Sequence, residues 1–474
     1  MQYKKCEVLN LSINSYDQYP LSWQPDRTLL TRPYYRSLVQ QLEADILSHK
    51  LQKNTRLPSQ RELADFLDIN FTTVGRAYKY GLEKGLLYTN IGSGTFVSQN
   101  AFNSITISNH NVDHHLIDLG LVSSFEECND LVTPYLARVS QQPNVQALLT
   151  YQDPLGTPQQ RQIAAEWLQT QGVSAVDRDN IAIVAGVQNG LAITLAGLFN
   201  PGDRIAVDRY TYSNFIELAN LLQIEVVLID GDQDGMLPNL LATECHKKKI
   251  HGVFLMPACN NPVGFQMTAE RRLALAAIFA TEALLVIEDD IHAFLTNFAI
   301  TDQLPTFQSL LPRQTIYLAS MAKFISSGLR VAYLVYPNNY RSRIERSIFN
   351  INVKTSAFDA EVVTQILQSP TAKTILARKL ALTQQANQLF DELFEQPQPT
   401  NPVPFYRILP VSPQIDQTTI ENYFLEQGVR IYHSNRFTTK KQPDPFIRIA
   451  LSSNHIDLLE QALLVIAEHI KQFQ

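Results

Sequence analysis

Cysteine is scarce in this chain, and the few cysteines are scattered. The 474 residues include 4 cysteines, at Cys6, Cys128, Cys245 and Cys259, and no two of them form a C-x-x-C pair. Structural zinc sites and disulfide frameworks need cysteines at characteristic spacings, so neither is expected here. The pattern therefore predicts no metal site and fits a protein of the reducing cytoplasm.

Long apolar runs are also absent. No stretch has the roughly 20 apolar residues of a membrane-spanning helix, and Met1-Gln-Tyr-Lys-Lys-Cys-Glu7 lacks the apolar core of a signal peptide. Hydrophobic residues make up 45% of the chain and charged residues 18%, which is the balance of a soluble globular protein with no membrane partner. A chain of 474 residues is too long for one ordinary core and predicts two or three domains.

The charge of the chain is uneven. Its formal net charge is −6, yet residues 1–98 hold 12 Lys and Arg against 9 Asp and Glu. A mildly basic N-terminal part on an acidic body permits contact with nucleic acid at one end. This excess of positive charge is small and does not by itself predict DNA binding, so the prediction depends on the sequence motifs of this part.

The first hundred residues carry three helical signals. Apolar residues recur with helical spacing over residues 34–49. Ser59-Gln-Arg-Glu62 is a capping box that starts a second helix, and Asn70 can cap a third helix that Gly85 stops. Two short helices joined by a tight turn predict a helix-turn-helix. Residues 86–89 and 95–97 then read as a β-hairpin wing.

This stretch resembles the winged helix-turn-helix of GntR-type bacterial transcription regulators. The shared residues include Arg56–Ala64, Thr72–Val74 and Gly92–Val97, and the resemblance covers residues 32–98. It implies binding of double-stranded operator DNA, whereas a plain interaction domain with solvated Arg and Lys is the alternative. Phe71 departs from the family, which usually has a polar or basic residue there. The residues expected to face DNA are Arg61, Thr72, Thr73, Arg76, Lys79 and, in the wing, Ser93.

Residues 99–116 are polar and without periodicity, which predicts a linker. From residue 117 to 360, apolar runs alternate with helical patterns and predict a large α/β domain whose sheet is mainly parallel and covered by helices. Residues 361–474 predict a smaller α+β C-terminal lobe. The expected strands are Ile181–Ala185, Arg204–Asp208, Val226–Asp230, Gly252–Met256, Leu284–Glu288, Ile316–Leu318 and Val331–Val335.

A lysine lies between the last two of these apolar runs. Lys323 must lose its charge or find a partner there, and an ε-amine with a lowered pKa is the nucleophile that forms a Schiff base with an aldehyde cofactor. Ser320 offers a hydroxyl and Arg330 a cation suited to a phosphate. A solvated lysine of no special role would give the same local pattern, so other residues must decide.

Polar residues at other strand ends favour the same chemistry. The turn Gly186-Val187-Gln188 can present free amides to a phosphate. Tyr212 could stack on an aromatic ring, and Asn261 could offer an amide to a phenolic oxygen. Asp289 ends a strand and could keep a pyridine nitrogen protonated. Arg448 on a late strand could clamp a carboxylate.

Residues from about 117 to 470 resemble the fold-type I pyridoxal 5′-phosphate (PLP) aminotransferases, whose motifs occur here in the same order. The resemblance implies PLP as cofactor, with the Schiff base on Lys323, Asp289 at the pyridine nitrogen and Asn261 at O3′. It implies that Arg448 binds the α-carboxylate of an amino compound and that Tyr212 stacks on the ring. The implied phosphate ligands are Gly186, Val187, Gln188, Ser320, Arg330 and Tyr151, the last of which reaches the neighbouring subunit in this family.

His292 departs from this family pattern. Many relatives have a tyrosine at this position, whose hydroxyl helps to tune the cofactor, and others have one at the position of Ile291. A neutral imidazole could replace that hydrogen bond, or the histidine could simply pack. The sequence leaves both alternatives open.

A GntR-like head followed by an aminotransferase-like body resembles the MocR subfamily of bacterial regulators. The resemblance implies a head-to-tail homodimer whose large domain senses PLP, an amino compound, or both, and thereby controls the winged-helix heads. The alternative hypothesis is a working PLP-dependent aminotransferase with an accessory DNA-binding domain. Nothing in the sequence identifies the effector or the operator.

Overall fold

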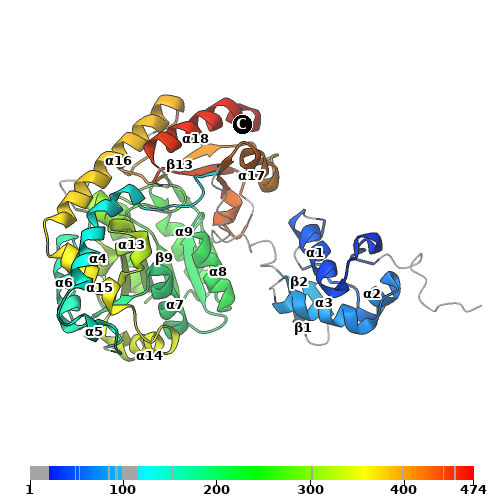
Figure 1. Ribbon diagram of the computed structural model, residues 1–474, viewed down its shortest axis with the longest axis horizontal. Helices are drawn as coiled ribbons and strands as arrows, with labels where there is room; N and C mark the ends of the chain where they lie inside the picture. The colour runs from blue at the N-terminus through cyan, green and yellow to red at the C-terminus, as the bar shows by residue number, and fades with distance from the viewer. Residues whose placement is uncertain are drawn as a thin grey trace, which may run out of the picture. The chain divides into compact units, whose positions relative to one another are not determined.

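The computed structural model describes residues 21–474 apart from residues 49, 53, 84–85, 91–93, 99–115, 152, 175, 300–302, 398, 441 and 453–454. The chain forms two compact units, residues 1–108 and 109–474 (Figure 1). The predicted linker, residues 99–116, lies almost wholly outside the described residues. Among the described residues, no helix combines the length and the apolar character that crossing a bilayer requires.

The N-terminal unit is a three-helix bundle followed by a hairpin. Its elements are α1 (Tyr34–Leu47), α2 (Gln60–Leu67), α3 (Phe71–Glu83), β1 (Leu87–Asn90) and β2 (Gly94–Val97). The predicted capping box is present, because Ser59 accepts from the Glu62 amide while the Glu62 carboxylate accepts from the Ser59 amide. Such a cap is worth about 1 kcal/mol. The hairpin pairs Leu87 with Val97 in an antiparallel register, as expected for a wing.

The core of this unit extends further upstream than the predicted boundary at residue 32. The Trp23 side chain is buried among the residues of α1 to α3, and its indole Nε1 donates to the Asp45 carboxylate at 2.8 Å. The segment before α1 therefore belongs to the folded head. The expected stop at Gly85 and the wing residue Ser93 lie outside the described residues.

The second unit is built on a seven-stranded mixed sheet with the order β4-β12-β11-β10-β9-β5-β6. Only β12 runs antiparallel to its neighbours, so the prediction of a mainly parallel sheet is confirmed. Side chains of β4, β9, β11 and β12 are buried on both faces, which explains why these strands read as continuous apolar runs. The strands are β4 (Ile181–Val184), β5 (Arg204–Asp208), β6 (Glu225–Ile229), β9 (Gly252–Leu255), β10 (Leu285–Asp289), β11 (Thr315–Ser320) and β12 (Ala332–Val335).

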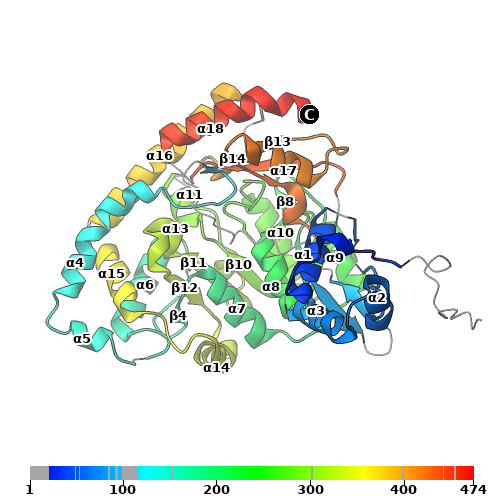
Figure 2. The ribbon, with the colours of Figure 1, turned by 45° about the vertical axis from the view of Figure 1, so that its right-hand side comes forward.

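Helices cover both faces of this sheet (Figure 2). Apolar side chains of α7, α8 and α14 form one core with the sheet, and those of α6, α9, α10 and α15 pack on the other face. The helices of the large domain are α4 (Thr133–Ser140), α5 (Val145–Leu148), α6 (Pro158–Thr170), α7 (Val187–Leu198), α8 (Ser213–Leu221), α9 (Pro238–Lys247), α10 (Ala269–Thr281), α11 (Ala293–Ala299), α12 (Phe307–Leu310), α13 (Met321–Phe324), α14 (Arg341–Ile351) and α15 (Ala357–Leu367).

The C-terminal lobe is an α+β layer, as predicted. A three-stranded sheet of order β13-β16-β15 packs its apolar side chains against α16 and α18, which lie side by side (Figure 1). The strand β3 (Ile117–Asp118), which the predicted boundary assigned to the large domain, pairs instead with β14 (Val429–Arg430) of this lobe. The other elements are α16 (Thr371–Leu393), β13 (Tyr406–Pro410), α17 (Gln417–Glu426), β15 (Tyr432–His433), β16 (Phe446–Ala450) and α18 (Ile456–His469); a further hairpin in the large domain joins β7 (Gly231–Asp232) to β8 (Gly235–Met236).

Candidate functional site

The predicted cofactor residues lie where neighbouring strands end. Tyr212 follows β5, Asn261 follows β9, and Asp289 is the last residue of β10. These three strands are parallel and adjacent, so their carboxyl ends meet at one edge of the sheet. Lys323 comes directly after β11, the next strand across. The topology thus brings four dispersed segments to one place.

Lys323 lies in the short helix α13, where the Ser320 hydroxyl accepts from its backbone amide at 3.3 Å. Its Nζ donates to the carbonyl of Val122. Burial lowers the pKa of this amine to about 8, with Glu126 opposing the shift and Arg330 and Arg448 adding to it. A substantial fraction of the Lys323 side chains is therefore neutral and nucleophilic near pH 8.

A cradle for a phosphate forms between the turn after β4 and Arg330. Gly186 precedes α7 with a φ of 85°, so the first amides of this helix are open to an anion. A Cβ atom built on Gly186 would lie 2.6 Å from the Arg330 Nη2, so only glycine admits the guanidinium here. Arg330 itself adopts a left-handed φ of 51°, which is unusual outside glycine and is found at functional sites.

The neighbouring residues Val187 and Gln188 begin α7 beside this cradle. The Gln188 Nε2 donates to the carbonyl of Asn214 at 3.3 Å, and its buried Oε1 has no hydrogen-bond partner in the part of the chain that the structure describes. An unsatisfied acceptor in a native protein indicates a missing donor, such as a water or a ligand group.

Asp289 is the most unusual carboxylate of the site. Its two neighbours are satisfied, since Glu288 accepts from the amides of Phe307 and Gln308 and Asp290 accepts from the amide of Ala258. Both oxygens of Asp289 are buried, and no group of the described residues donates a hydrogen bond to either of them. Burial first, and then the nearby Asp290, raise its pKa well above the usual range. A buried carboxylate of this kind calls for a donor or cation that the described residues do not supply.

Arg448 is fully buried and lies on β16, the late strand that the sequence predicted for it. Its Nη1 donates to the Asn261 Oδ1 at 2.6 Å, and its Nη2 donates to the carbonyl of Gly120. No carboxylate among the described residues forms a salt bridge with it, and its Nε has no partner. Burial lowers its pKa to about 10. A buried guanidinium with spare donors can bind an anionic group.

The His292 side chain makes both a stacking contact and a hydrogen bond. Its ring stacks on Phe405 at a centroid distance of 4.1 Å, and its Nε2 forms a 2.5 Å hydrogen bond with the Tyr406 hydroxyl. Burial and the nearby Lys323 hold the pKa of His292 well below its usual value, so the imidazole is neutral. Tyr406 comes from β13 of the C-terminal lobe and was not anticipated from the sequence, because a single tyrosine in a short strand gives no local signal.

Tyr212 and Tyr151 differ sharply in their surroundings. Tyr212 precedes α8, and burial followed by the charge of Asp289 raises the pKa of its phenol, which shows that both lie in one environment. Tyr151, by contrast, is 90% exposed and takes no part in the site of its own chain. The fold thus brings together all predicted cofactor residues except Tyr151.

Lys379 is a second buried lysine that sequence reasoning missed. It lies on α16 and is 1% exposed, and its Nζ donates to Ser124 Oγ, to the Lys323 carbonyl at 3.0 Å and to the Ile325 carbonyl at 3.4 Å. Burial lowers its pKa to about 7. Lys379 therefore ties the long helix of the C-terminal lobe to the backbone that carries Lys323.

In the N-terminal unit, the predicted DNA-facing side chains lie at the second and third helices. Four of these side chains are exposed, namely Arg61, Thr72, Arg76 and Lys79, and the side chain of Thr73 is half-buried. Asn70 caps α3 by accepting from the Thr72 amide at 2.8 Å. The Arg76 guanidinium lies 4.4 Å from the centre of the Tyr35 ring, which limits its freedom. Phe71, which departs from the family pattern, is 47% exposed at the start of α3.

The fold and the site define a fusion of a winged helix-turn-helix with an aminotransferase-like domain. The family model of bacterial regulatory proteins of the gntR family matches residues 34–97, and that of aminotransferase class I and II matches residues 128–466. The chain belongs to the GntR-type transcriptional regulators with a class I and II aminotransferase domain, which is the MocR architecture.

Relatives of both kinds support this assignment. The HTH-type transcriptional regulator YdeF of Bacillus subtilis is 31% identical over 459 residues, which cover 96% of this chain and 98% of that protein. An archaeal alanine:glyoxylate aminotransferase shares the fold of 75% of this chain and 91% of its own, with 20% identity and a TM-score of 0.70. Kynurenine aminotransferase of Pyrococcus horikoshii, solved in complex with PMP, has 20% identity over 76% of this chain and 91% of its own, with a TM-score of 0.69.

Proposed function

We propose that this protein is a PLP-binding transcription regulator in which the aminotransferase-like domain senses the cofactor, an amino compound, or both. The observation that carries the proposal is the buried Asp289, which lies at the same edge of the sheet as Lys323 and whose two oxygens have no hydrogen-bond partner among the described residues. A protonated pyridine nitrogen would supply the missing cation and donor.

The other residues fit the remaining parts of PLP. The Arg330 guanidinium and the amides after Gly186 suit its phosphate, and Tyr212 suits one face of its ring. Lys323, with its pKa lowered to about 8, suits the aldehyde carbon. When bound, PLP acts as an electron sink for amino compounds. The protein's own contribution is to orient the ring, to neutralise the phosphate and to lower the pKa of the Lys323 amine, so that more of it is neutral.

An amino compound with a carboxylate fits the same site. Arg448 is buried and has a donor to spare, so the carboxylate of such a compound can bind there while its amine points towards Lys323. The neutral His292 and the Tyr406 hydroxyl form a hydrogen-bonded pair between the large domain and the C-terminal lobe. A ligand that moves this pair would move the two lobes relative to each other.

The regulatory part of the proposal rests on the head. The DNA contacts of the proposal lie within residues 32–98 of the head, at Arg61, Thr72, Thr73, Arg76, Lys79 and the wing residue Ser93. Tyr151 is 90% exposed, which suits a residue that completes the cofactor site of a second subunit. We therefore propose a homodimer whose two heads bind two half-sites.

Borohydride reduction tests the cofactor site. The protein incubated with PLP and reduced should carry one pyridoxyl group per chain, on the peptide that contains Lys323. Lys323→Ala should carry none, whereas Lys379→Met, which removes the other buried lysine, should still be labelled. Labelling of Lys323→Ala to the same extent would refute the site.

Turnover separates the regulator from the working aminotransferase. Lys323, Asp289 and Arg448 are the residues that an aminotransferase would use for the Schiff base, the pyridine nitrogen and the substrate carboxylate, and this supports the aminotransferase alternative. With PLP, an amino acid and a keto acid, a regulator should give a spectral change without sustained product. Many turnovers per site would favour the enzyme instead.

A further inference from the structure

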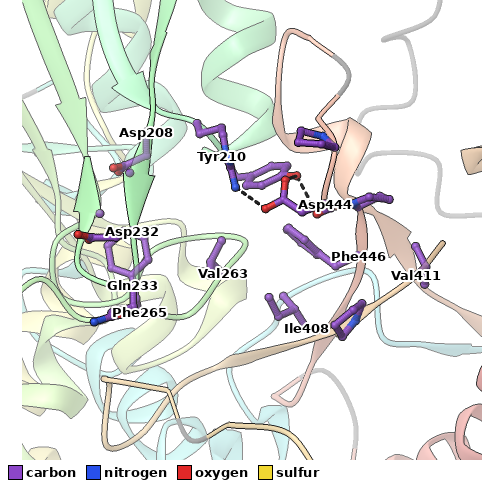
Figure 3. Close-up of a pocket in the computed structure, with 16 residues that line it drawn as sticks. Asp208, Tyr210, Asp232, Gln233, Val263, Phe265, Ile408, Val411, Asp444 and Phe446 are labelled. Atoms are coloured by element: carbon purple, nitrogen blue, oxygen red, sulfur yellow. Dashed lines mark hydrogen bonds and ion pairs between the residues drawn. The ribbon is translucent and has the colours of Figure 1, made fainter. Parts of the chain in front are cut away.

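A cavity of about 420 Å³ lies between the large domain and the C-terminal lobe, apart from the proposed cofactor site (Figure 3). One wall comes from the end of β5, the β7–β8 hairpin and the segment after Asn261. The other wall comes from β13, the residues just after it, and the segment 443–446. Its volume falls within the range of roughly 300–1,000 Å³ that is usual for small-molecule sites.

The body of the cavity is apolar and aromatic. Figure 3 shows Val263 and Phe265 on the side of the large domain and Ile408 and Phe446 on the side of the lobe. The Tyr210 ring meets the Phe446 ring edge to face at a centroid distance of 4.8 Å. Aromatic faces attract organic cations as well as apolar groups.

The charged side chains of the cavity are mainly carboxylates. Asp444 is paired with Arg209, and Asp232 accepts from the Arg271 Nη2 at 2.8 Å, so these two are neutralised. Among the described residues, Asp208 accepts from two neutral donors, the Met236 amide at 2.8 Å and the Asn260 Nδ2 at 3.4 Å, and it is also near the charge of Arg271, which itself pairs with Asp232. Asp208 is 5% exposed, and burial raises its pKa to about 7.

Asp208 is therefore a buried carboxylate without an ion pair among the described residues. Ionised carboxylates in such places are costly unless a positive charge compensates them. An anionic ligand would meet one more negative charge, since the arginine of the cavity is already paired with Asp444. A cation, in contrast, would be attracted both by the charge of the Asp208 carboxylate and by the faces of the aromatic rings.

We propose that this cavity binds a small organic ammonium compound, with its cationic group towards Asp208 and its apolar body against Phe265, Tyr210 and Phe446. The site is distinct from the cofactor site, because none of the described residues that line it is a predicted cofactor residue. It is nevertheless adjacent. Tyr210 precedes Tyr212 by two residues, Val263 follows Asn261 by two, and Phe446 precedes Arg448 by two. A ligand here touches three segments that also carry cofactor-site residues.

Benzyltrimethylammonium is a suitable probe because a quaternary ammonium cannot react with an aldehyde or with Lys323. Calorimetric titration of the full-length protein as purified should show saturable binding of this cation. Benzyl alcohol and phenylacetate, which present the same ring with no charge or a negative charge, should each bind at least about tenfold more weakly, which corresponds to about 1.4 kcal/mol. Equal binding of the three probes, or no saturable binding of the cation, would overturn the proposal.

Substitutions locate the binding. Asp208→Asn should weaken benzyltrimethylammonium by about tenfold or more, while the matched control Asp232→Asn, whose carboxylate already has its own arginine, should change the affinity by less than about threefold. If Asp208→Asn does not fold, Phe265→Leu should weaken the cation by about two- to fivefold through loss of the aromatic face. An unchanged affinity in the folded variants would refute this location.

Discussion

Replacement of Gly186 by alanine should weaken PLP binding by more than its effect on the stability of the domain explains. Gly186 has a φ of 85° and a ψ of 164°, a region that is essentially restricted to glycine and costs other residues about 1–3 kcal/mol. Its new Cβ would also lie 2.6 Å from the Arg330 Nη2 and push the guanidinium out of the cradle. Loss of a charge-assisted contact of about 1.5–3 kcal/mol should weaken PLP about 10- to 100-fold.

Gly202→Ala is the matched control. Gly202 has a similar φ of 88°, but nothing lies within 4 Å of a Cβ built there. This variant should lose stability from backbone strain and keep its affinity for PLP. Titration of both variants with PLP, followed by absorbance and paired with thermal melting, gives the comparison. Unchanged PLP affinity in Gly186→Ala, or equal loss in Gly202→Ala, would refute the assignment of the cradle.

Three further predictions concern the cofactor amine, the effector and DNA. Burial lowers the pKa of Lys323 to about 8 in the cofactor-free protein, and the neutral amine is the nucleophile, so the rate of its covalent linkage to PLP should rise as the pH passes through about 8 and then level off. A rate that climbs without a plateau to about pH 10 would contradict this. Arg448→Lys loses the forked donor pair and should weaken the spectral response to amino acids about 10-fold or more while PLP still binds, and an unchanged response would exclude Arg448 as the carboxylate site. Arg76→Ala should lower the log–log salt slope of operator binding by about 0.9 if Arg76 contacts one phosphate, whereas an unchanged slope would place it off the DNA.

Local signals explain why much of the fold could be predicted from the sequence. Strands buried on both faces read as continuous apolar runs, and β5 was predicted with its observed bounds, Arg204–Asp208. The capping box at Ser59 needs only four consecutive residues to be recognised. Parallel strands bring their carboxyl ends to one edge of a sheet, so the polar residues at the ends of β5, β9 and β10 could be grouped from the sequence alone.

Features that depend on long-range packing could not be predicted. The pairing of Ile117 with Val429 joins two very short strands that are far apart in the sequence. Lys379 lies in a long helix rich in polar residues, where a buried lysine and a solvated one look alike until Ser124 and the Lys323 carbonyl surround it. Tyr406 likewise acquires its place beside His292 only when the lobe folds onto the large domain.

In the proposed function, ligand binding at Lys323 is coupled to DNA binding by the head. Such coupling requires the ligand to prefer one arrangement of the heads. Coupling of two binding equilibria is reciprocal, so if PLP changes the operator affinity by some factor, operator DNA must change the PLP affinity by the same factor. Titration of PLP into the full-length protein with and without its operator measures this factor directly. We expect PLP to bind with two different affinities in the two titrations. Identical affinities, together with unchanged bending of the DNA, would contradict this coupling and favour the aminotransferase alternative.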